Sequence, residues 1–165
     1  MIHFETQRLI LRNVQPGDVP IMYDYRNNEI CAKFQRGQVK TLPEITALVE
    51  KRSCDALSAD SPAMVAVALK ETNEMIGEIV VMPNNPTLSL GYTFSYKHHR
   101  KGYAFEALSF LIEHLHEQLP EWEFICLTEP ENIPSIALLK KLGYEDLGYA
   151  EKITSQVFGK WAIPE

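Results

Sequence analysis

The segment His99-Arg100-Lys101-Gly102-Tyr103-Ala104-Phe105-Glu106-Ala107 lies where the sequence pattern changes from strand to helix. Before it, residues 88–96 (Leu-Ser-Leu-Gly-Tyr-Thr-Phe-Ser-Tyr) favour a strand and follow the turn residues 84–87 (Asn-Asn-Pro-Thr). After it, apolar residues recur at helical spacing, at Ala104, Leu108, Leu111, Leu115 and Leu119. The pattern predicts a strand followed directly by a helix over residues 103–118.

This junction has the chemistry of an anion site. The start of a helix leaves backbone N–H groups unpaired and carries a partial positive charge. Gly102 has no Cβ, so a ligand can approach the backbone closely, and Arg100 and Lys101 add two positive charges. Such a site suits a phosphate or pyrophosphate. A solvated basic turn would carry the same residues, so this stretch alone leaves both interpretations open.

The residues from Leu90 to Ala107 resemble the signature of the GNAT superfamily of N-acetyltransferases, in which Gln/Arg-x-x-Gly-x-Gly/Ala follows a strand. Gly102 and Ala104 match the last two fixed positions. His99 stands where the family most often has Gln or Arg. The contacts that the resemblance implies with pyrophosphate come mostly from backbone N–H groups, so this departure leaves the loop's expected role in place.

Two further blocks extend the resemblance. Residues 131–144 are similar to the family's Asn-x-x-Ser…Leu-Gly-Phe/Tyr segment. Residues 5–12 (Glu-Thr-Gln-Arg-Leu-Ile-Leu-Arg) look like the opening strand of the subgroup that resembles the ribosomal-protein alanine N-acetyltransferases. The three blocks span nearly the whole chain in the expected order.

Composition predicts one ordinary globular domain over residues 1–165, since 45% of the residues are apolar and 23% are charged. The net charge of −6 gives no basic face for nucleic acid, so nucleic acid is not expected as the main partner. An acidic surface is compatible with a cationic amine, but many proteins without such a substrate are also acidic. Both a monomer and a homodimer are compatible with the sequence.

Cysteine usage and the N-terminus predict a cytoplasmic protein without metal. The three cysteines form no CxxC pair and no metal-ligand cluster, which favours a reducing compartment, and Cys126 is expected in the core. Residues 1–5 lack the basic and apolar parts of a signal peptide. No apolar run approaches the roughly 20 residues of a membrane span, so no membrane contact is expected.

Periodicity and turn residues predict an α/β (α+β) domain with a mixed, mostly antiparallel central sheet and flanking helices. Strands are expected over residues 8–12, 63–69, 75–82, 88–96 and 124–128, with a final hairpin between 144 and 163 that turns at Thr154-Ser155. Helices are expected over residues 18–27, 41–57, 103–118 and 132–141, with Gly143 as the last C-cap, while residues 30–40 show no clear period. The strands from 63 to 96 read as an antiparallel meander, and the helix at 103–118 then leads to a parallel pairing.

The resemblance implies that acetyl-CoA lies between two parallel strands that splay apart, here those ending near Ser95 and Thr128. Its pantetheine arm would pair with backbone groups of Phe94 and Ser95. Its pyrophosphate would lie on the loop. The expected loop residues are His99, Arg100, Lys101, Gly102, Tyr103 and Ala104.

Asn132 and Ser135 are the expected polar residues of the second block. The Asn132 amide could bind the pantetheine, or it could only cap the following helix. Ser135 could donate a hydrogen bond to the departing sulfur, as the resemblance to the ribosomal-protein subgroup implies, or it could be a first-turn serine without a role. Many family members use a tyrosine about two turns into this helix, where this chain has Leu138 and Leu139.

Glu78 and Glu129 are the candidate general bases, because the attacking amine must lose a proton and the family has no single fixed base. Each could instead be a plain surface carboxylate. Glu106 reads as structural. The predicted function is acetyl transfer from acetyl-CoA to a primary amine by direct attack, the amine being a protein N-terminus or a small molecule such as a polyamine, amino acid or aminoglycoside.

Two other classes of protein are alternatives to this function. The first is an acyl-CoA-binding regulatory module without turnover, which the absent tyrosine keeps open. The second is a nucleotide-binding Rossmann domain, which lacks support because no GxGxxG follows a first strand.

Overall fold

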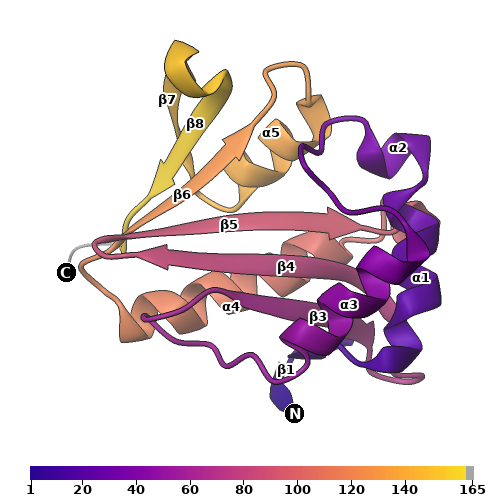
Figure 1. The fold of residues 1–165 in the computed structure, drawn as a ribbon. Coiled ribbons are helices and arrows are strands. Elements are labelled where there is room, and N and C mark those ends of the chain that lie inside the picture. Colours follow the sequence, from indigo (N-terminus) through magenta and orange to yellow (C-terminus); the bar gives the residue numbers. More distant parts are fainter. Residues whose placement is uncertain (163–165) are drawn as a thin grey trace.

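The computed structural model describes residues 1–162 and is built around an eight-stranded sheet of order β1-β2-β3-β4-β5-β6-β8-β7 (Figure 1). The strands are β1 (Ile2–Glu5), β2 (Leu9–Asn13), β3 (Ala63–Leu69), β4 (Met75–Asn84), β5 (Thr87–Phe94), β6 (Glu123–Thr128), β7 (Glu145–Ala150) and β8 (Ser155–Lys160). The helices are α1 (Val19–Arg26), α2 (Glu29–Ala32), α3 (Leu42–Arg52), α4 (Tyr103–Gln118) and α5 (Ile133–Lys141), with short 3-10 helices at Pro16–Asp18, Tyr96–His98 and Glu151–Ile153.

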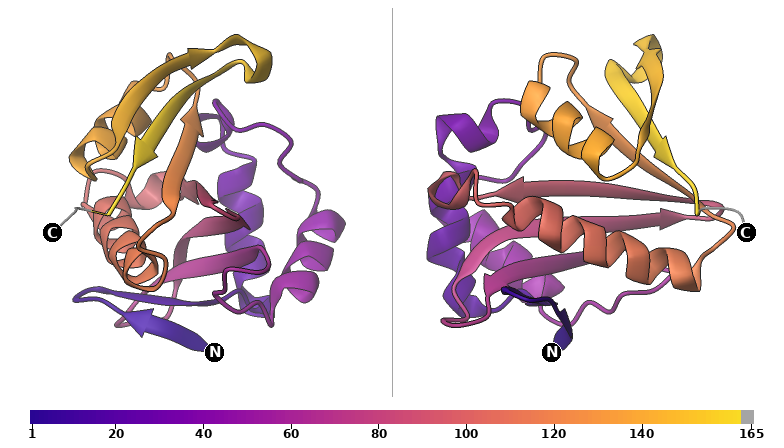
Figure 2. Two further views of the ribbon diagram at one scale, coloured as in Figure 1. Left: turned by 90° about the vertical axis from the view of Figure 1, so that its left-hand side faces the viewer. Right: turned by 180° about the vertical axis from the view of Figure 1, so that it is seen from behind.

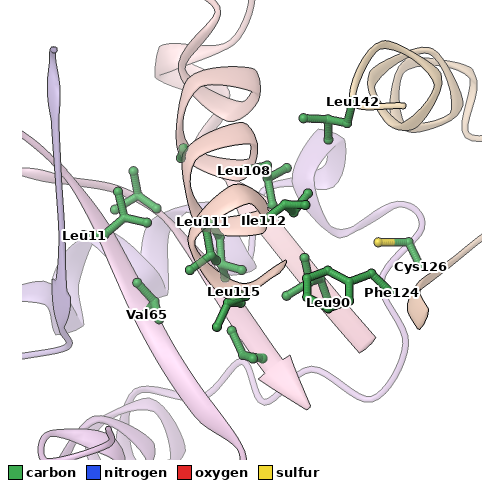
Figure 3. Packing of buried hydrophobic residues seen from close by; sticks show 14 of the residues in the cluster. Leu11, Val65, Leu90, Leu108, Leu111, Ile112, Leu115, Phe124, Cys126 and Leu142 are labelled. Carbon is green, nitrogen blue, oxygen red and sulfur yellow. The ribbon is translucent and has the colours of Figure 1, made fainter. Parts of the chain in front are cut away.

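Helices cover both faces of the first five strands (Figure 2). On one face lies α4, whose leucines pack with side chains of the sheet such as Val65 and Leu90 (Figure 3). On the other face lie α1 and α3, which pack through Met22 and Ile45. Strand β3 is a continuous apolar run because it is buried between these two layers.

The predicted meander and parallel crossover are confirmed. Strands β3, β4 and β5 pair antiparallel, and β6 joins β5 in parallel. The parallel ladder joins only Thr87 to Glu123, Leu88 to Phe124 and Ser89 to Ile125. Beyond that point the two strands diverge, as Figure 1 shows, so the fold class with a splayed parallel pair is confirmed.

The structure corrects some predicted boundaries. Helix α3 ends at Arg52 rather than Leu57. Its apolar residues Ile45 and Val49 belong to the cluster around Met22, whereas Leu57 packs against the cluster on the α4 face. After Arg52 the chain passes from the cluster on the α1 face to the cluster on the α4 face, where Leu57 packs.

Other differences lie at the ends and turns of the chain. Strand β1 and helix α2 were not predicted, and both are only four residues long. Leu142 is the C-cap of α5, and Gly143 follows it with φ of +94°, as is typical one position later. The turn of the final hairpin runs through Glu151–Ile153 to Thr154, and Ile163 lies outside the described residues.

Cys126 is buried in the core, as predicted. Within residues 1–162, no helix combines the length and the apolar character needed to cross a bilayer.

Candidate functional site

The gap between the diverging strands offers the backbone groups of alternate β5 residues. Ser95 donates its N–H to the Ile76 carbonyl of the neighbouring strand at 2.8 Å, and its own carbonyl accepts from the His98 N–H at 3.0 Å. Backbone groups along an antiparallel strand point alternately to its two sides. The backbone groups of Phe94, Tyr92 and Leu90 therefore point away from β4 and toward β6. Ser95 has no backbone group left for a bound chain, which corrects the role expected for it; Phe94 keeps the required orientation.

Three side chains already contact this open edge. His99 donates from Nε2 to the Phe94 carbonyl at 2.8 Å, and the Cys31 thiol lies 3.4 Å from the same oxygen. Gln35 donates from Nε2 to the Tyr92 carbonyl at 3.3 Å. His99 therefore ties the loop back to the end of β5, a role that the motif position alone did not indicate.

The loop before α4 has the shape of an anion site. Arg100 and Gly102 both have left-handed backbone angles, with φ of +64° and +78°. Gly102 is the N-cap, so in the described chain no side chain caps this helix. The N–H groups of Tyr103 and Ala104, in the first turn, are left for a ligand. Lys101 lies between the two left-handed residues and carries the second positive charge.

Arg8 braces this loop from the other end of the sequence. Its guanidinium donates to the Lys101 carbonyl at 2.9 Å and to Glu106 at 2.7 Å, and it lies over the Tyr103 ring. Glu106 also accepts from the Thr6 hydroxyl at 2.5 Å. Partial burial alone would raise the pKa of Glu106, but these hydrogen bonds lower it, so the carboxylate stays ionised. The contacts support the structural reading of Glu106, whose partners Thr6 and Arg8 could not be predicted because they are about 100 residues away in the sequence.

Gly102→Val is expected to weaken CoA binding. A β-branched residue is strained at φ of +78°, and its Cβ would meet Arg8 Nη2 at 3.4 Å, beside the N–H groups of the loop. Gly148→Val is the matched control, because Gly148 has φ of +100° and open space around it in the exposed strand β7. Both variants should lose roughly 1–2 kcal/mol of unfolding free energy. Calorimetric titration with CoA should show lower affinity only for Gly102→Val; equal affinities would move the phosphate site elsewhere.

Ser135 and Asn132 lie at the start of α5, beside the open edge of β5. Asn132 caps the helix by accepting from the Ser135 N–H at 3.3 Å, so its side-chain oxygen is used in the cap. The Ser135 hydroxyl lies 2.6 Å from the hydroxyl of Tyr92. Burial raises the pKa of Tyr92, so its hydroxyl keeps its proton. Sequence reasoning missed Tyr92, although its place on the strand beside the gap was a usable signal.

The two candidate bases lie in different surroundings. Glu78 is buried, so the surface alternative is wrong for it; it forms a two-bonded ion pair with Arg26, at 2.8 and 2.6 Å, and accepts from the Tyr25 hydroxyl at 2.8 Å. Glu129 is partly exposed and pairs with Arg36. Arg36 also donates to the carbonyls of the hairpin turn at Ile153 and Thr154.

Two cavities adjoin these carboxylates. A cavity of about 420 Å³ is bordered by Glu78 and Arg26 and by Thr93 on β5. A second, of about 530 Å³, is bordered by Glu129 and Glu131. Both cavities are also bordered by Gln35 and Arg36, so this pair of residues separates them. We call the first the Glu78 cavity.

Residues 92–94 are the point where the candidate residues meet. Tyr92 contacts Ser135, Thr93 lies opposite Glu78 in the strand register, and Phe94 accepts from His99. Glu129 is not part of this group. The arrangement combines an open strand edge, an uncapped helix start and a carboxylate beside a cavity, which suits an extended ligand with a phosphate end and a second substrate.

Comparison with known proteins shows which family the chain belongs to. A family model described as an acetyltransferase (GNAT) domain matches residues 8–145. The chain belongs to the GNAT acetyltransferase family. The resemblance found in the sequence is thereby confirmed, and as a GNAT protein the chain is an N-acetyltransferase that depends on acetyl-CoA.

Individual relatives of this GNAT domain include the uncharacterized N-acetyltransferase YnaD of Bacillus subtilis, which is 28% identical over 153 residues, covering 92% of this chain and 87% of the relative. A GNAT acetyltransferase from Bacillus anthracis has the same fold, with a TM-score of 0.83, 23% identity and 98% of each chain covered. RimL, a ribosomal L7/L12 alpha-N-protein acetyltransferase solved with coenzyme A, superposes with a TM-score of 0.77 and 15% identity over 98% of each chain.

Proposed function

We propose that this GNAT protein transfers the acetyl group directly to a primary amine, with both substrates bound together. The observation that carries the proposal is the open β5 edge at Tyr92 and Phe94, which leads to the uncapped start of α4. An acyl carrier with an extended amide arm and a pyrophosphate fits that combination. We assign the protein to the cytoplasm, in keeping with its cysteine usage.

The binding roles follow from the chain's own groups. The backbone of Phe94 and Tyr92 would hold the arm, once the contacts from His99 and Gln35 are exchanged for those of the ligand. The N–H groups from Arg100 to Ala104 would hold the pyrophosphate, with Arg8 keeping the loop in shape. Asn132 would contribute its Nδ2 group while its oxygen remains in the helix cap.

Glu78 is the better of the two candidate bases. In its described contacts its carboxylate accepts three hydrogen bonds, and a carboxylate has about four acceptor positions, so it can accept one more from an amine in the Glu78 cavity. Arg26 balances its charge. Glu129 borders the other cavity and is held by Arg36. We therefore assign proton removal from the amine to Glu78.

Ser135 is the proposed hydrogen-bond donor on the opposite side of the reaction. Acetyl-CoA, when bound, supplies the acetyl group as a reactive thioester. Ser135 would donate its hydroxyl proton into a hydrogen bond with the sulfur as negative charge collects there. Tyr92, protonated and 2.6 Å away, would hold the serine hydroxyl in position. The rest of the rate acceleration would come from holding the two substrates together in the right orientation.

The proposal is tested by free-thiol release from acetyl-CoA across a panel of primary amines. Saturating CoA should first raise the melting temperature, because a ligand that binds only the folded state stabilises it. Thiol release should then depend on the amine, and mass spectrometry should find the acetylated amine. Binding of CoA without acetylation of any amine would favour a regulatory acyl-CoA-binding module, and an unchanged melting temperature together with no calorimetric binding would overturn both.

A further inference from the structure

The Glu78 cavity carries an indication of which amine it receives. We propose that the acceptor is a primary amine with an apolar side chain and no second charge near the amine, held through an N–H by Gln38 Oε1. The inference rests on the proposed function and concerns the same site. It reduces the number of acceptor amines that the sequence left open.

The side-chain oxygen of Gln38 is available to accept a hydrogen bond from a substrate. Its Nε2 donates to Thr93 Oγ1 on β5 at 3.1 Å. Its Oε1 is buried and has no hydrogen-bond partner in the described part of the chain. Buried polar atoms are almost always hydrogen-bonded, because leaving one unpaired is costly. Since Gln38 borders the Glu78 cavity, an N–H group of a bound substrate is the donor that fits.

The rest of the cavity wall is largely apolar. Leu48 from α3 and Met64, Val80 and Met82 from the sheet border it. Gly91 on β5 adds no side chain, and a Cβ placed there would meet only Met82 Cε, at 3.9 Å. The volume of about 420 Å³ lies within the range of small-molecule sites, so the cavity has room for an apolar side chain beside the amine.

The charges on the wall are already paired. Arg26 is neutralised by Glu78, and Arg36 by Glu129. A second charge on the substrate would lose its water here without gaining an opposite charge. This disfavours polyamines, free amino acids and aminoglycosides. The reacting amine does not remain charged in the cavity, because it passes its proton to Glu78 before it attacks the thioester.

A peptide N-terminus and a small apolar amine can both present a primary amine with an apolar side chain and no second charge nearby. Their kcat/KM values in a series of acceptors distinguish them. The series consists of glycinamide, alaninamide, leucinamide, lysinamide, free leucine and a tetrapeptide that begins with leucine. Thiol release should give kcat/KM values about tenfold to a hundredfold higher for leucinamide than for glycinamide. Lysinamide and free leucine should be poorer than leucinamide. A higher value for the tetrapeptide than for leucinamide identifies the source as a peptide, and the reverse identifies a small amine.

Two variants test the cavity itself. Gln38→Met keeps the length of the side chain and removes its hydrogen bonds, and it should raise the KM for leucinamide roughly fivefold to tenfold. Gln118→Met, on the exposed end of α4, is the matched control and should leave KM unchanged. Gly91→Val has room to fold and adds an isopropyl group to the cavity wall, so it should reduce the preference for leucinamide over glycinamide and leave the CoA-induced rise in melting temperature intact.

The outcomes separate this inference from the proposed function. Acetylation of amines with equal kcat/KM for glycinamide and leucinamide, or Gln38→Met and Gly91→Val behaving as the wild type, would overturn the inference and leave the acetyltransferase proposal standing. CoA binding with no acetylated amine at all would instead overturn the proposed function. Efficient turnover of lysinamide or free leucine would show that the paired charges do not exclude a second charge.

Discussion

Ser135→Ala is expected to lower turnover roughly tenfold to a thousandfold, within the range of acid–base and oxyanion-type contacts, while the affinity for acetyl-CoA stays close to that of the wild type. The hydroxyl would stabilise a sulfur whose negative charge develops mainly as the C–S bond breaks. An interaction made chiefly in the transition state affects turnover more than binding. Single-turnover kinetics and calorimetric titration on the same variant measure both quantities.

The structure supplies the controls for this experiment. Tyr92→Phe removes the hydroxyl that lies 2.6 Å from Ser135, so it should cause part of the same loss in turnover, and the double variant should lose less than the product of the two effects. Ser109→Ala, near the middle of helix α4, is the matched serine change and should leave turnover unaffected. If Ser135→Ala kept full turnover and lost only stability, about 1 kcal/mol, a bound water would replace Ser135 in the mechanism.

Glu78→Gln is expected to lower the free energy of unfolding by about 3–5 kcal/mol. The change leaves the Arg26 guanidinium buried without its counter-charge, and removing one partner of a buried ion pair is costly. Glu129→Gln is the matched control, since its partner Arg36 is half exposed and exposed pairs contribute only about 0–1 kcal/mol. Chemical denaturation of the three proteins provides the comparison.

The chemical role of Glu78 requires a second variant that restores stability. Replacing both partners, Glu78→Met with Arg26→Met, should recover much of the lost stability, because apolar side chains of similar size can replace a buried pair. If Glu78 takes the proton from the amine, this double variant should remain slow at neutral pH and gain activity as the pH rises and neutral amine becomes available. Wild-type activity in the stable double variant would remove Glu78 from the reaction.

The elements with strong local signals could be predicted from the sequence. Helix α4 has regular leucine spacing and was predicted with its observed bounds, and strand β3 is a continuous apolar run. The short elements β1 and α2 could not be predicted, because four residues carry too little periodicity and their positions depend on tertiary contacts.

The residues of the candidate site also differ in how well a single sequence can predict them. The anion site predicted for the loop from Arg100 to Ala104 rests on chemistry that lies in one continuous stretch of sequence. The Arg26–Glu78 pair, the contact of Tyr92 with Ser135 and the brace at Arg8 each join residues 43 to 98 positions apart. A single sequence contains no signal for such pairs. Register explains the correction at Ser95, since moving one residue along a strand reverses the direction of its backbone groups.

The short ladder between β5 and β6 also bears on association between copies of the protein. An exposed strand edge acts as a template on which another chain can add a strand, and this is a common origin of aggregation. In the part of the chain that the structure describes, the unpaired edges of β5 beyond Ser89 and of β6 beyond Ile125 face each other inside one molecule. Gln35 covers the first at the Tyr92 carbonyl, and Arg36 fastens the covering segment to the hairpin turn. This enclosure withholds the strand edge from other polypeptides, and the extended ligand proposed above would reach it only by displacing the Gln35 contact.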